Sequence, residues 1–249
     1  MPYRKLILAL NGILILLLAA CQAVTVSPAV PTPVTWQVRH TATVSWLGAD
    51  FNQCMLAQPH ARLIIFETPA VALEPAVGSF AFRWGAPPDF QGFAAIIGWD
   101  ELTMIVHPDN PVESLTLANI IDIYSGAATN WEKIDPSSVP MTGRIHPWVY
   151  PDGNDVMDIF ISLTAGPLQQ DAVLYLAPDP QAMIDAVAND VAAIGFIPGR
   201  WLDARVRAIS ISDVDAEALR QPILSLDTAE PVGEQRAWLL CLQHRLERQ

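Results

Sequence analysis

Basic residues are scarce in this sequence. It contains 14 lysines and arginines against 26 aspartates and glutamates, which gives a formal net charge of −12 at pH 7. A chain this acidic repels phosphate backbones and anionic lipid surfaces. The composition therefore argues against nucleic acid as a partner.

The residue patterns of metal, nucleotide and hydrolytic sites are missing as well. The 3 cysteines cannot complete a zinc motif, and the 5 histidines show no metal-ligand spacing. The sequence also has no glycine-rich phosphate loop, no HExxH helix and no GxSxG turn. We therefore expect no metal, no cofactor and no enzymatic activity.

Only the N-terminus has a long apolar run. Arg4 and Lys5 precede the apolar residues 6–20, which is the layout of a secretory signal. The run ends in Leu-Ala-Ala-Cys at 18–21, which resembles the lipobox of bacterial lipoproteins, where the cysteine is acylated and becomes the mature N-terminus. The resemblance implies a signal peptide over 1–21 and a lipid on Cys21. The alternative is an uncleaved anchor helix, and either reading places the rest of the chain outside the cytoplasm.

A short segment separates this signal from the folded body. Residues 22–34 are rich in Ala, Val, Thr, Ser and Pro and carry no charge, which is typical of a tether. The body is expected to begin at Thr35 and to comprise roughly 215 residues, enough for two lobes with their own cores. No second apolar run long enough to span a bilayer follows.

Short apolar segments alternate with amphipathic ones through the body. Strands are predicted over 35–41, 62–68, 79–84, 94–107, 145–150 and 191–197, with helices between them and a last helix from Val232. Two helix starts are well marked. Thr116 can cap a stripe that includes Ile120 and Ile121, and Asp179 with Pro180 in the first turn begins another helix. This alternation predicts an α/β fold.

Residues 106–134 read VHPDNPVESLTLANIIDIYSGAATNWEKI. An Asp-Asn-Pro turn at 109–111, a helix ending in Tyr-Ser-Gly at 124–126 and an Asn-Trp pair at 130–131 follow one another. This order is similar to that of phosphate-type ABC transporter substrate-binding proteins. Residues 184–197 (IDAVANDVAAIGFI) resemble the same family, as do residues 223–242, which include Glu-Pro-Val-Gly.

The resemblance implies a type 2 periplasmic-binding-protein fold. Two α/β lobes would be joined by a hinge of two chain crossings, near His107 and near Gln221, and would close on a ligand. Lobe I would comprise 35–106 plus 221–249, and lobe II would comprise 107–220.

Two cysteines remain for the folded body. The resemblance implies that Cys54 and Cys241 lie in the same lobe, where an oxidising compartment would allow a disulfide. The alternative is two buried thiols that pack as small apolar residues.

The oxyanion motif of the family is altered in this chain. The family has an arginine, then Ser-Gly-Thr at the start of a helix, then a phenylalanine, and alignment on Phe160 puts Tyr150 at the arginine and Asn154, Asp155 and Val156 at Ser-Gly-Thr. Tyr150 and Asn154 can still donate hydrogen bonds, but the guanidinium charge is missing and Asp155 sets a carboxylate where the phosphate should sit. Alternatively, Asn154 and Asp155 cap the helix, which is the role expected for Asp155.

Five further residues are candidates for contacts in the cleft. Thr43 and Ser45 follow the first strand, Arg83 and Trp84 end the third, and Asp100 lies before the hinge. An arginine beside a tryptophan can bind an anion and stack on a planar group. The alternatives are loop capping for Thr43 and Ser45, a surface arginine over a half-buried Trp84, and hinge packing for Asp100.

These observations predict an extracytoplasmic solute-binding lipoprotein of an ABC importer. It would be a monomer, attached to the membrane by its lipid, that closes on a small anionic or polar solute and delivers it to a permease. The alternative is a sensory or scaffold lipoprotein that keeps this fold without small-molecule transport. A hydrolase on the same fold is not favoured, because no nucleophile and base can be paired.

Overall fold

The computed structural model describes residues 32–134, 141–164 and 172–248. The elements below all belong to one compact unit, Val34–Gln249. The signal segment, Cys21 and the tether up to residue 31 lie outside the described residues. None of the helices in the described ranges has the length and apolar character that a membrane span requires.

The described strands form one mixed sheet, in the order β2-β1-β3-β10-β4-β8-β6-β7, with β9 beside β4 and β5 beside β9. The strands are β1 (Val34–His40), β2 (Ala61–Glu67), β3 (Ser79–Trp84), β4 (Phe93–Val106), β5 (Ser114–Leu115), β6 (His146–Val149), β7 (Tyr175–Leu176), β8 (Ala193–Pro198), β9 (Arg207–Ile211) and β10 (Arg220–Asp227).

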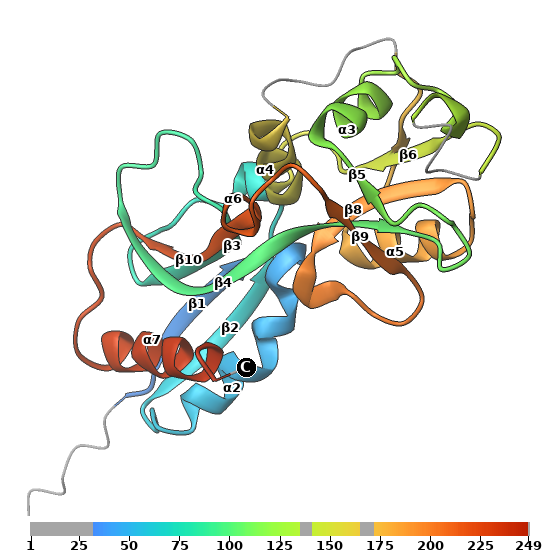
Figure 1. The fold of residues 1–249 in the computed structure, drawn as a ribbon. Helices are drawn as coiled ribbons and strands as arrows, with labels where there is room; N and C mark the ends of the chain where they lie inside the picture. The colour runs from blue at the N-terminus through green and yellow to red at the C-terminus, as the bar shows by residue number, and fades with distance from the viewer. Residues whose placement is uncertain (1–31, 135–140, 165–171, 249) are drawn as a thin grey trace, which may run out of the picture. The chain divides into compact units, whose positions relative to one another are not determined.

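The long strand β4 belongs to both halves of this sheet (Figure 1). Residues 93–101 pair with β10, whereas residues 102–106 pair with β8. We call the side with β1–β3 and β10 lobe I and the side with β5–β9 lobe II, so the expected two-lobed α/β fold is confirmed. Between Glu101 and Leu102 the pairing partner of β4 changes from β10 to β8, without a break in the strand. The chain returns to lobe I through β10.

The helices lie between these strands along the chain. They are η1 (Ala42–Leu47), α2 (Gly48–Met55), η2 (Ala70–Ala72), α3 (Leu117–Tyr124), η3 (Trp131–Lys133), α4 (Asp155–Leu163), α5 (Pro180–Ala188), η4 (Gly199–Trp201), α6 (Ala216–Leu219) and α7 (Gly233–Leu246), where η marks short 3₁₀ turns.

Thr116 and Asp179 cap α3 and α5 as expected, each accepting a backbone N–H of the first turn. Ile121, however, is exposed, and Ile123 is buried beside Ile120 in its place. Residues 120, 123 and 124 recur at the helical spacing and therefore share the buried face of α3.

Aromatic rings fill the core of lobe I. Trp36, Phe80 and Phe82 from the sheet pack against Phe51 of α2 and Trp238 of α7, with ring centroids 4.8 Å apart for Phe51–Phe82 and for Phe80–Trp238. All five side chains are buried. Burial of this much aromatic surface holds both helices on one face of the sheet.

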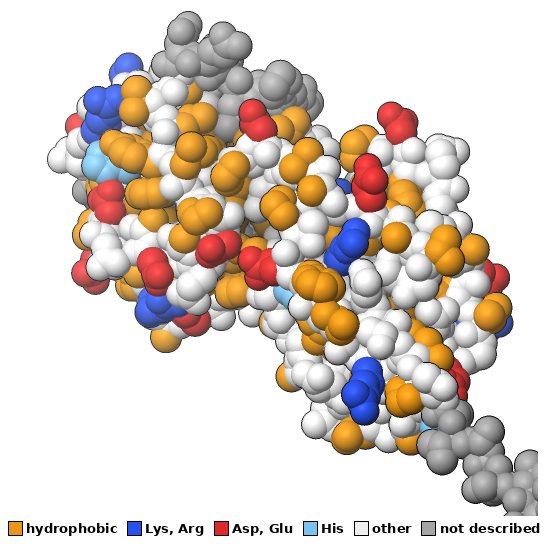
Figure 2. All heavy atoms as spheres, turned by 180° about the vertical axis from the view of Figure 1, so that it is seen from behind, with side chains coloured by type: hydrophobic (Ala, Val, Ile, Leu, Met, Phe, Trp, Pro, Cys, Tyr) orange, Lys and Arg blue, Asp and Glu red, His pale blue; other side chains and the backbone are white. Residues whose placement is uncertain are grey.

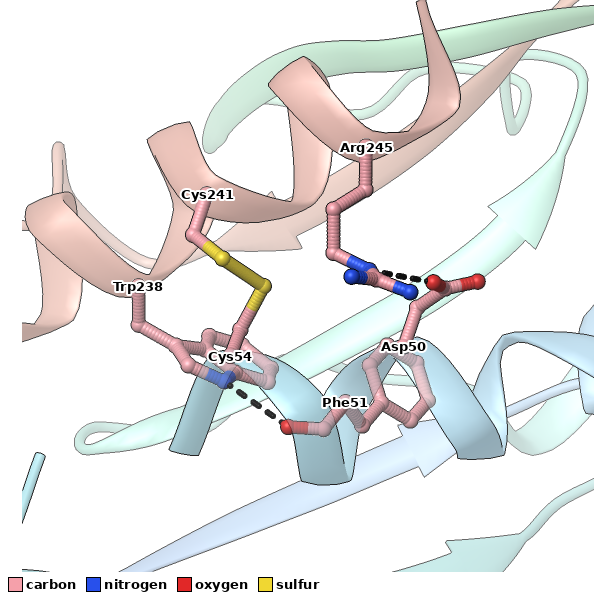
Figure 3. The surroundings of a disulfide bond; sticks show 6 residues. All are labelled: Asp50, Phe51, Cys54, Trp238, Cys241 and Arg245. Atoms are coloured by element: carbon pink, nitrogen blue, oxygen red, sulfur yellow. Dashed lines mark hydrogen bonds and ion pairs between the residues drawn. A yellow bond between two sulfur atoms is a disulfide. The ribbon is translucent and has the colours of Figure 1, made fainter. Parts of the chain in front are cut away.

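A disulfide joins these two helices (Figure 3). Cys54 of α2 and Cys241 of α7 are bonded, with their Cα atoms 5.8 Å apart. Arg245 of α7 donates to Asp50 of α2 at 2.5 Å, one turn along from the bridge. Of the two alternatives for the cysteines, the structure has the bridge, and the C-terminal helix is thereby tied to the first helix of lobe I.

A second aromatic cluster forms the core of lobe II. Phe160 of α4 stacks on Phe196 of β8 with centroids 4.0 Å apart, and Tyr124 of α3 meets Phe160 edge-on at 4.8 Å. The stacking holds α4 against the sheet. Its N-terminal residues then reach the boundary with lobe I.

Asp100 lies within β4, where the strand passes from lobe I to lobe II. Its carboxylate accepts the backbone N–H of Glu101 at 2.9 Å and that of Arg200 at 3.3 Å. Beside it, the Arg220 guanidinium lies 4.8 Å from the centroid of the Trp99 ring. Burial raises the pKa of Asp100 from 3.8 to about 6, an effect that outweighs the two N–H donors, which lower it. Asp100 therefore belongs to the hinge, which is the alternative to a ligand contact that the sequence left open.

Replacing Cys54 and Cys241 by serine together should lower the free energy of unfolding by about 2–5 kcal/mol, because the bridge closes a long loop in the unfolded chain. The sequence separation is 187 residues. Urea unfolding followed by tryptophan fluorescence measures the loss, and reduction of the wild-type chain should reproduce it. The double variant should not respond to reductant. Equal unfolding midpoints for oxidised and reduced wild type would contradict a bridge between α2 and α7.

Asp100→Asn should change how stability depends on pH. The pKa of Asp100 is about 6 in the folded chain against a usual 3.8, so folding takes up a proton between these values. The wild type should therefore gain stability relative to Asp100→Asn as the pH falls from about 7 to about 4. Urea unfolding of both proteins across this range measures the difference. If the free energies of unfolding of the two proteins changed equally with pH, the raised pKa of Asp100 would be refuted.

Candidate functional site

A cleft of about 390 Å³ lies between the two lobes. Lobe I contributes the loops that follow β1 and β2, and lobe II contributes the loops that follow β6 and β7. The cleft is lined by Thr41, Ala42, Glu67, Thr68, Pro69, Ala70, Val71, Pro151, Asp152, Gly153, Asn154, Asp155, Pro178 and Asp179.

The topology places the cleft at the ends of parallel strands. β1 pairs in parallel with β2, and β6 pairs in parallel with β7, so the carboxyl ends of each pair meet at one edge. Crevices outside these ends are where open α/β sheets bind ligands. The helices α4 and α5 also begin there, with their N-cap residues Asn154 and Asp179 among the lining residues.

Asp155 is the central residue of this boundary. Its side chain is fully buried. Thr41 donates to one carboxylate oxygen at 2.7 Å, Thr43 donates to the other at 2.5 Å, and the backbone N–H of Trp84 donates to the first at 3.1 Å. We call these four residues the carboxylate site. All three donors belong to lobe I, whereas the carboxylate belongs to lobe II.

The cap of α4 is a different residue. Asn154 is the N-cap, and its side-chain oxygen accepts the N–H of Val156 at 2.9 Å. Asp155 is the first residue inside the helix, so the expectation that it caps α4 is wrong. Once Asn154 has taken the cap bond, the Asp155 side chain is left to bond with the opposite lobe.

A second contact crosses the boundary one turn along α4. Arg83 of β3 is buried, and its guanidinium donates to Asp158 at 3.1 Å. The Asp158 side chain is 40% exposed, so solvent weakens this ion pair. Arg83 faces a separate cavity of about 490 Å³, together with Asp158, and does not line the cleft.

The residues that line the cleft are acidic. Glu67, Asp152, Asp155 and Asp179 are there, and no lysine or arginine is among the lining residues. The negative charges of Asp155 and Asp179, after the larger effect of burial, raise the pKa of Tyr150 well above its usual range. On the face of the molecule drawn in Figure 2, acidic, basic and apolar side chains are interspersed. Within the described residues no group of three or more His, Cys, Asp or Glu side chains could hold a metal ion.

The predicted site residues separate into those at the boundary and those elsewhere. Thr43, Trp84, Asn154 and Asp155 meet at or beside the carboxylate site, where Trp84 acts through its backbone N–H because its indole donates to the carbonyl of Gln221 at 3.1 Å. Arg83 lies beside them, paired with Asp158.

Tyr150 and Ser45 lie outside the cleft lining. Tyr150 is buried in lobe II, and its hydroxyl donates to the carbonyl of Phe196 at 3.0 Å, so its place as a ligand donor is not supported. Ser45 is half-buried in η1. The carbonyl of Phe196 thus satisfies a hydroxyl that is buried away from solvent.

Sequence reasoning missed Thr41, Glu67 and Asp158. Thr41 directly follows β1 and is separated from Thr43 by one residue. Two such hydroxyl side chains at the end of a strand are the signal that could have identified Thr41. Glu67 ends β2 in the same way. Asp158 is visible only as one of two acidic residues on α4, and nothing local relates it to Arg83.

Comparison with solved structures gives matches along most of the described chain. An ABC-type phosphate transport receptor from Vibrio cholerae matches with a TM-score of 0.66 and 18% identity, covering 84% of this chain and 93% of that chain. A protein from Clostridium perfringens, described as a phosphate ABC transporter substrate-binding protein with bound phosphate, matches with a TM-score of 0.70 and 20% identity, covering 84% and 92%.

A regulatory domain shares the same architecture. A sulfate-bound mutant of the OxyR2 regulatory domain from Vibrio vulnificus matches with a TM-score of 0.58 and 15% identity, covering 88% of this chain and 99% of that one. None of these three proteins is described as an enzyme. No protein-family model and no curated protein matches the sequence. The structural likeness therefore establishes that this chain has the two-lobed fold found in phosphate-type substrate-binding proteins of ABC transporters.

Proposed function

We propose that this chain is an extracytoplasmic solute-binding lipoprotein that captures a small polar solute in the cleft and delivers it to an ABC permease. The observation that carries this proposal is the cleft of about 390 Å³ between the lobes, at the carboxyl ends of parallel strands. Its volume lies within the range of small-molecule sites. Two structures of the same fold are described as phosphate-transport proteins, which supports a receptor role.

The chemistry of the cleft narrows the class of solute. Glu67, Asp152 and Asp179 line it without a basic residue, and the carboxylate of Asp155 already accepts three hydrogen bonds. An oxyanion entering this cleft would meet like charge. A neutral or cationic solute that donates hydrogen bonds fits the lining, so of the expected anionic or polar solutes we propose the polar ones.

A second candidate is the sensory or scaffold lipoprotein. The contacts of Asp155 and of Asp158 join the lobes without any solute. In a protein whose lobes are already joined, solute binding changes the lobe arrangement little, so the arrangement does not report the solute concentration. Such a chain would present one constant surface to a protein partner.

A thermal-shift screen separates the two candidates. The mature body should be stabilised by a solute from a panel of amines, amino acids and polyols, and not by phosphate, sulfate, molybdate, phosphonates or small organic acids. A solute at a hundred times its dissociation constant adds about 2.7 kcal/mol of stability. Silence across the whole panel would favour the scaffold role, and a saturable shift with phosphate would overturn the proposed solute class.

Two variants on one short helix test whether the solute lies in the cleft. Ala70 lines it, whereas Ala72 on the same turn does not. Ala70→Phe should weaken binding of any hit by about tenfold or more by filling the space, and Ala72→Phe should bind like wild type. Equal affinities for the two variants would place the solute elsewhere.

Cys21 is proposed as the lipidation site that anchors the protein. In a bacterial host fed an alkyne-labelled fatty acid, the wild-type chain should become labelled, and Cys21→Ser should lose the label and leave the membrane fraction. Ser27→Ala, which alters the tether but keeps the cysteine, serves as control. Label on Cys21→Ser equal to wild type would exclude this anchor.

A further inference from the structure

We propose that Asp155 is a built-in ligand: its carboxylate fills an oxyanion site between the lobes and holds them together without a solute. Thr41, Thr43 and Trp84 coordinate both of its oxygens from lobe I. The carboxylate comes from the first turn of α4, a helix of nine residues whose N-terminal N–H groups favour negative charge.

The arrangement has the features of a bound anion and not those of a buried core residue. A core carboxylate takes its donors from its own lobe, whereas the three donors of Asp155 all belong to the other lobe. The donors are themselves held in place. The carbonyl of Thr43 accepts the indole N–H of Trp201 at 2.7 Å, a further bond across the boundary because Trp201 lies in η4 of lobe II. Within lobe I, the Trp84 indole donates to the carbonyl of Gln221 at 3.1 Å.

The guanidinium of Arg83, beside the carboxylate site, is already paired with a carboxylate. Arg83 precedes Trp84, and its guanidinium is bonded to Asp158 of α4. The two carboxylates of α4 therefore take up the donors and the cation that an external oxyanion would need. A second anion would enter as an uncompensated charge, which is costly in a buried place.

Backbone packing on either side of the carboxylate site shows how closely the lobes meet. Gly153 has φ +76°, and a Cβ there would lie 2.9 Å from the Cβ of Val71 in lobe I. Gly85 has φ +73°, and a Cβ there would lie 2.9 Å from Ile159 of α4. Both positions need glycine for their backbone conformation and for this approach. The lobes are thus in direct contact on both sides of Asp155.

Removal of the carboxylate should expose the site to external anions. In Asp155→Ala the two threonine hydroxyls, the Trp84 N–H and the start of α4 would surround an empty space the size of a carboxylate. Formate reproduces that group, and phosphate and sulfate test whether a tetrahedral oxyanion fits. Asp155 would act in this way whichever of the two candidate functions holds, because all of these contacts are within the chain.

The test combines small-angle X-ray scattering with anion titrations of the mature, disulfide-bonded chain. Without anion, Asp155→Ala should have a larger radius of gyration than wild type. Formate, phosphate or sulfate should return it to the wild-type value and raise the unfolding temperature, relative to chloride at equal ionic strength. The midpoint of that response should lie at least about tenfold below any response of wild type. Asp122→Asn, which removes an exposed carboxylate of α3 that does not line the cleft, should behave like wild type.

The outcomes distinguish this proposal from the proposed binding of a solute in the cleft. A folded Asp155→Ala that keeps the wild-type radius and ignores all three anions would overturn the built-in ligand, whatever the wild-type solute screen finds. Should Asp155→Ala not fold, the Thr41→Val and Thr43→Val double variant keeps the shapes and removes two donors. An increased radius of this variant supports the proposal, and an unchanged radius overturns it.

Discussion

A carboxylate without exposed surface must find its donors inside the protein, and Asp155 finds three donors across the lobe boundary. Leaving such a group without partners costs more than most single contacts contribute. This side chain therefore helps to fix the relative position of the lobes, together with the Arg83–Asp158 pair. The hydroxyls of Thr41 and Thr43 have to lie on the same side of the boundary as the N–H of Trp84, which the parallel pairing of β1 with β3 provides.

Each lobe presents its half of this contact from a rigid base. In lobe I, aromatic packing and the Cys54–Cys241 bridge hold α2 and α7 on the sheet whose strand ends carry the donors. In lobe II, the stack of Phe160 on Phe196 holds α4 so that its first residue faces lobe I. Between them β4 passes through the hinge as one strand, and hydrogen bonds on both of its halves limit how the lobes can move.

A shared fold does not mean that this chain binds the same class of ligand as its structural neighbours. Two structures of this architecture are described as phosphate-transport proteins. In this chain the boundary between the lobes holds the carboxylate of Asp155, and the adjoining cleft is lined by acidic residues without a basic one. A shared fold supplies strand ends and helix starts at a cleft, and the side chains placed there decide which charge it accepts. On the proposal made above, the carboxylate of Asp155 at the start of α4 occupies the place that an oxyanion ligand would need.

The sequence by itself determined the α/β class, most element positions and the starts of α3 and α5, because periodicity and the caps at Thr116 and Asp179 act within a few residues. Family resemblance added the two-lobed arrangement and a common lobe for Cys54 and Cys241. Only the tertiary structure decided the role of Asp155, since a local reading makes an aspartate at a helix start a cap. Its true donors lie 114, 112 and 71 residues away, and partners at such separations are chosen by the packing of the lobes and not by the neighbouring sequence.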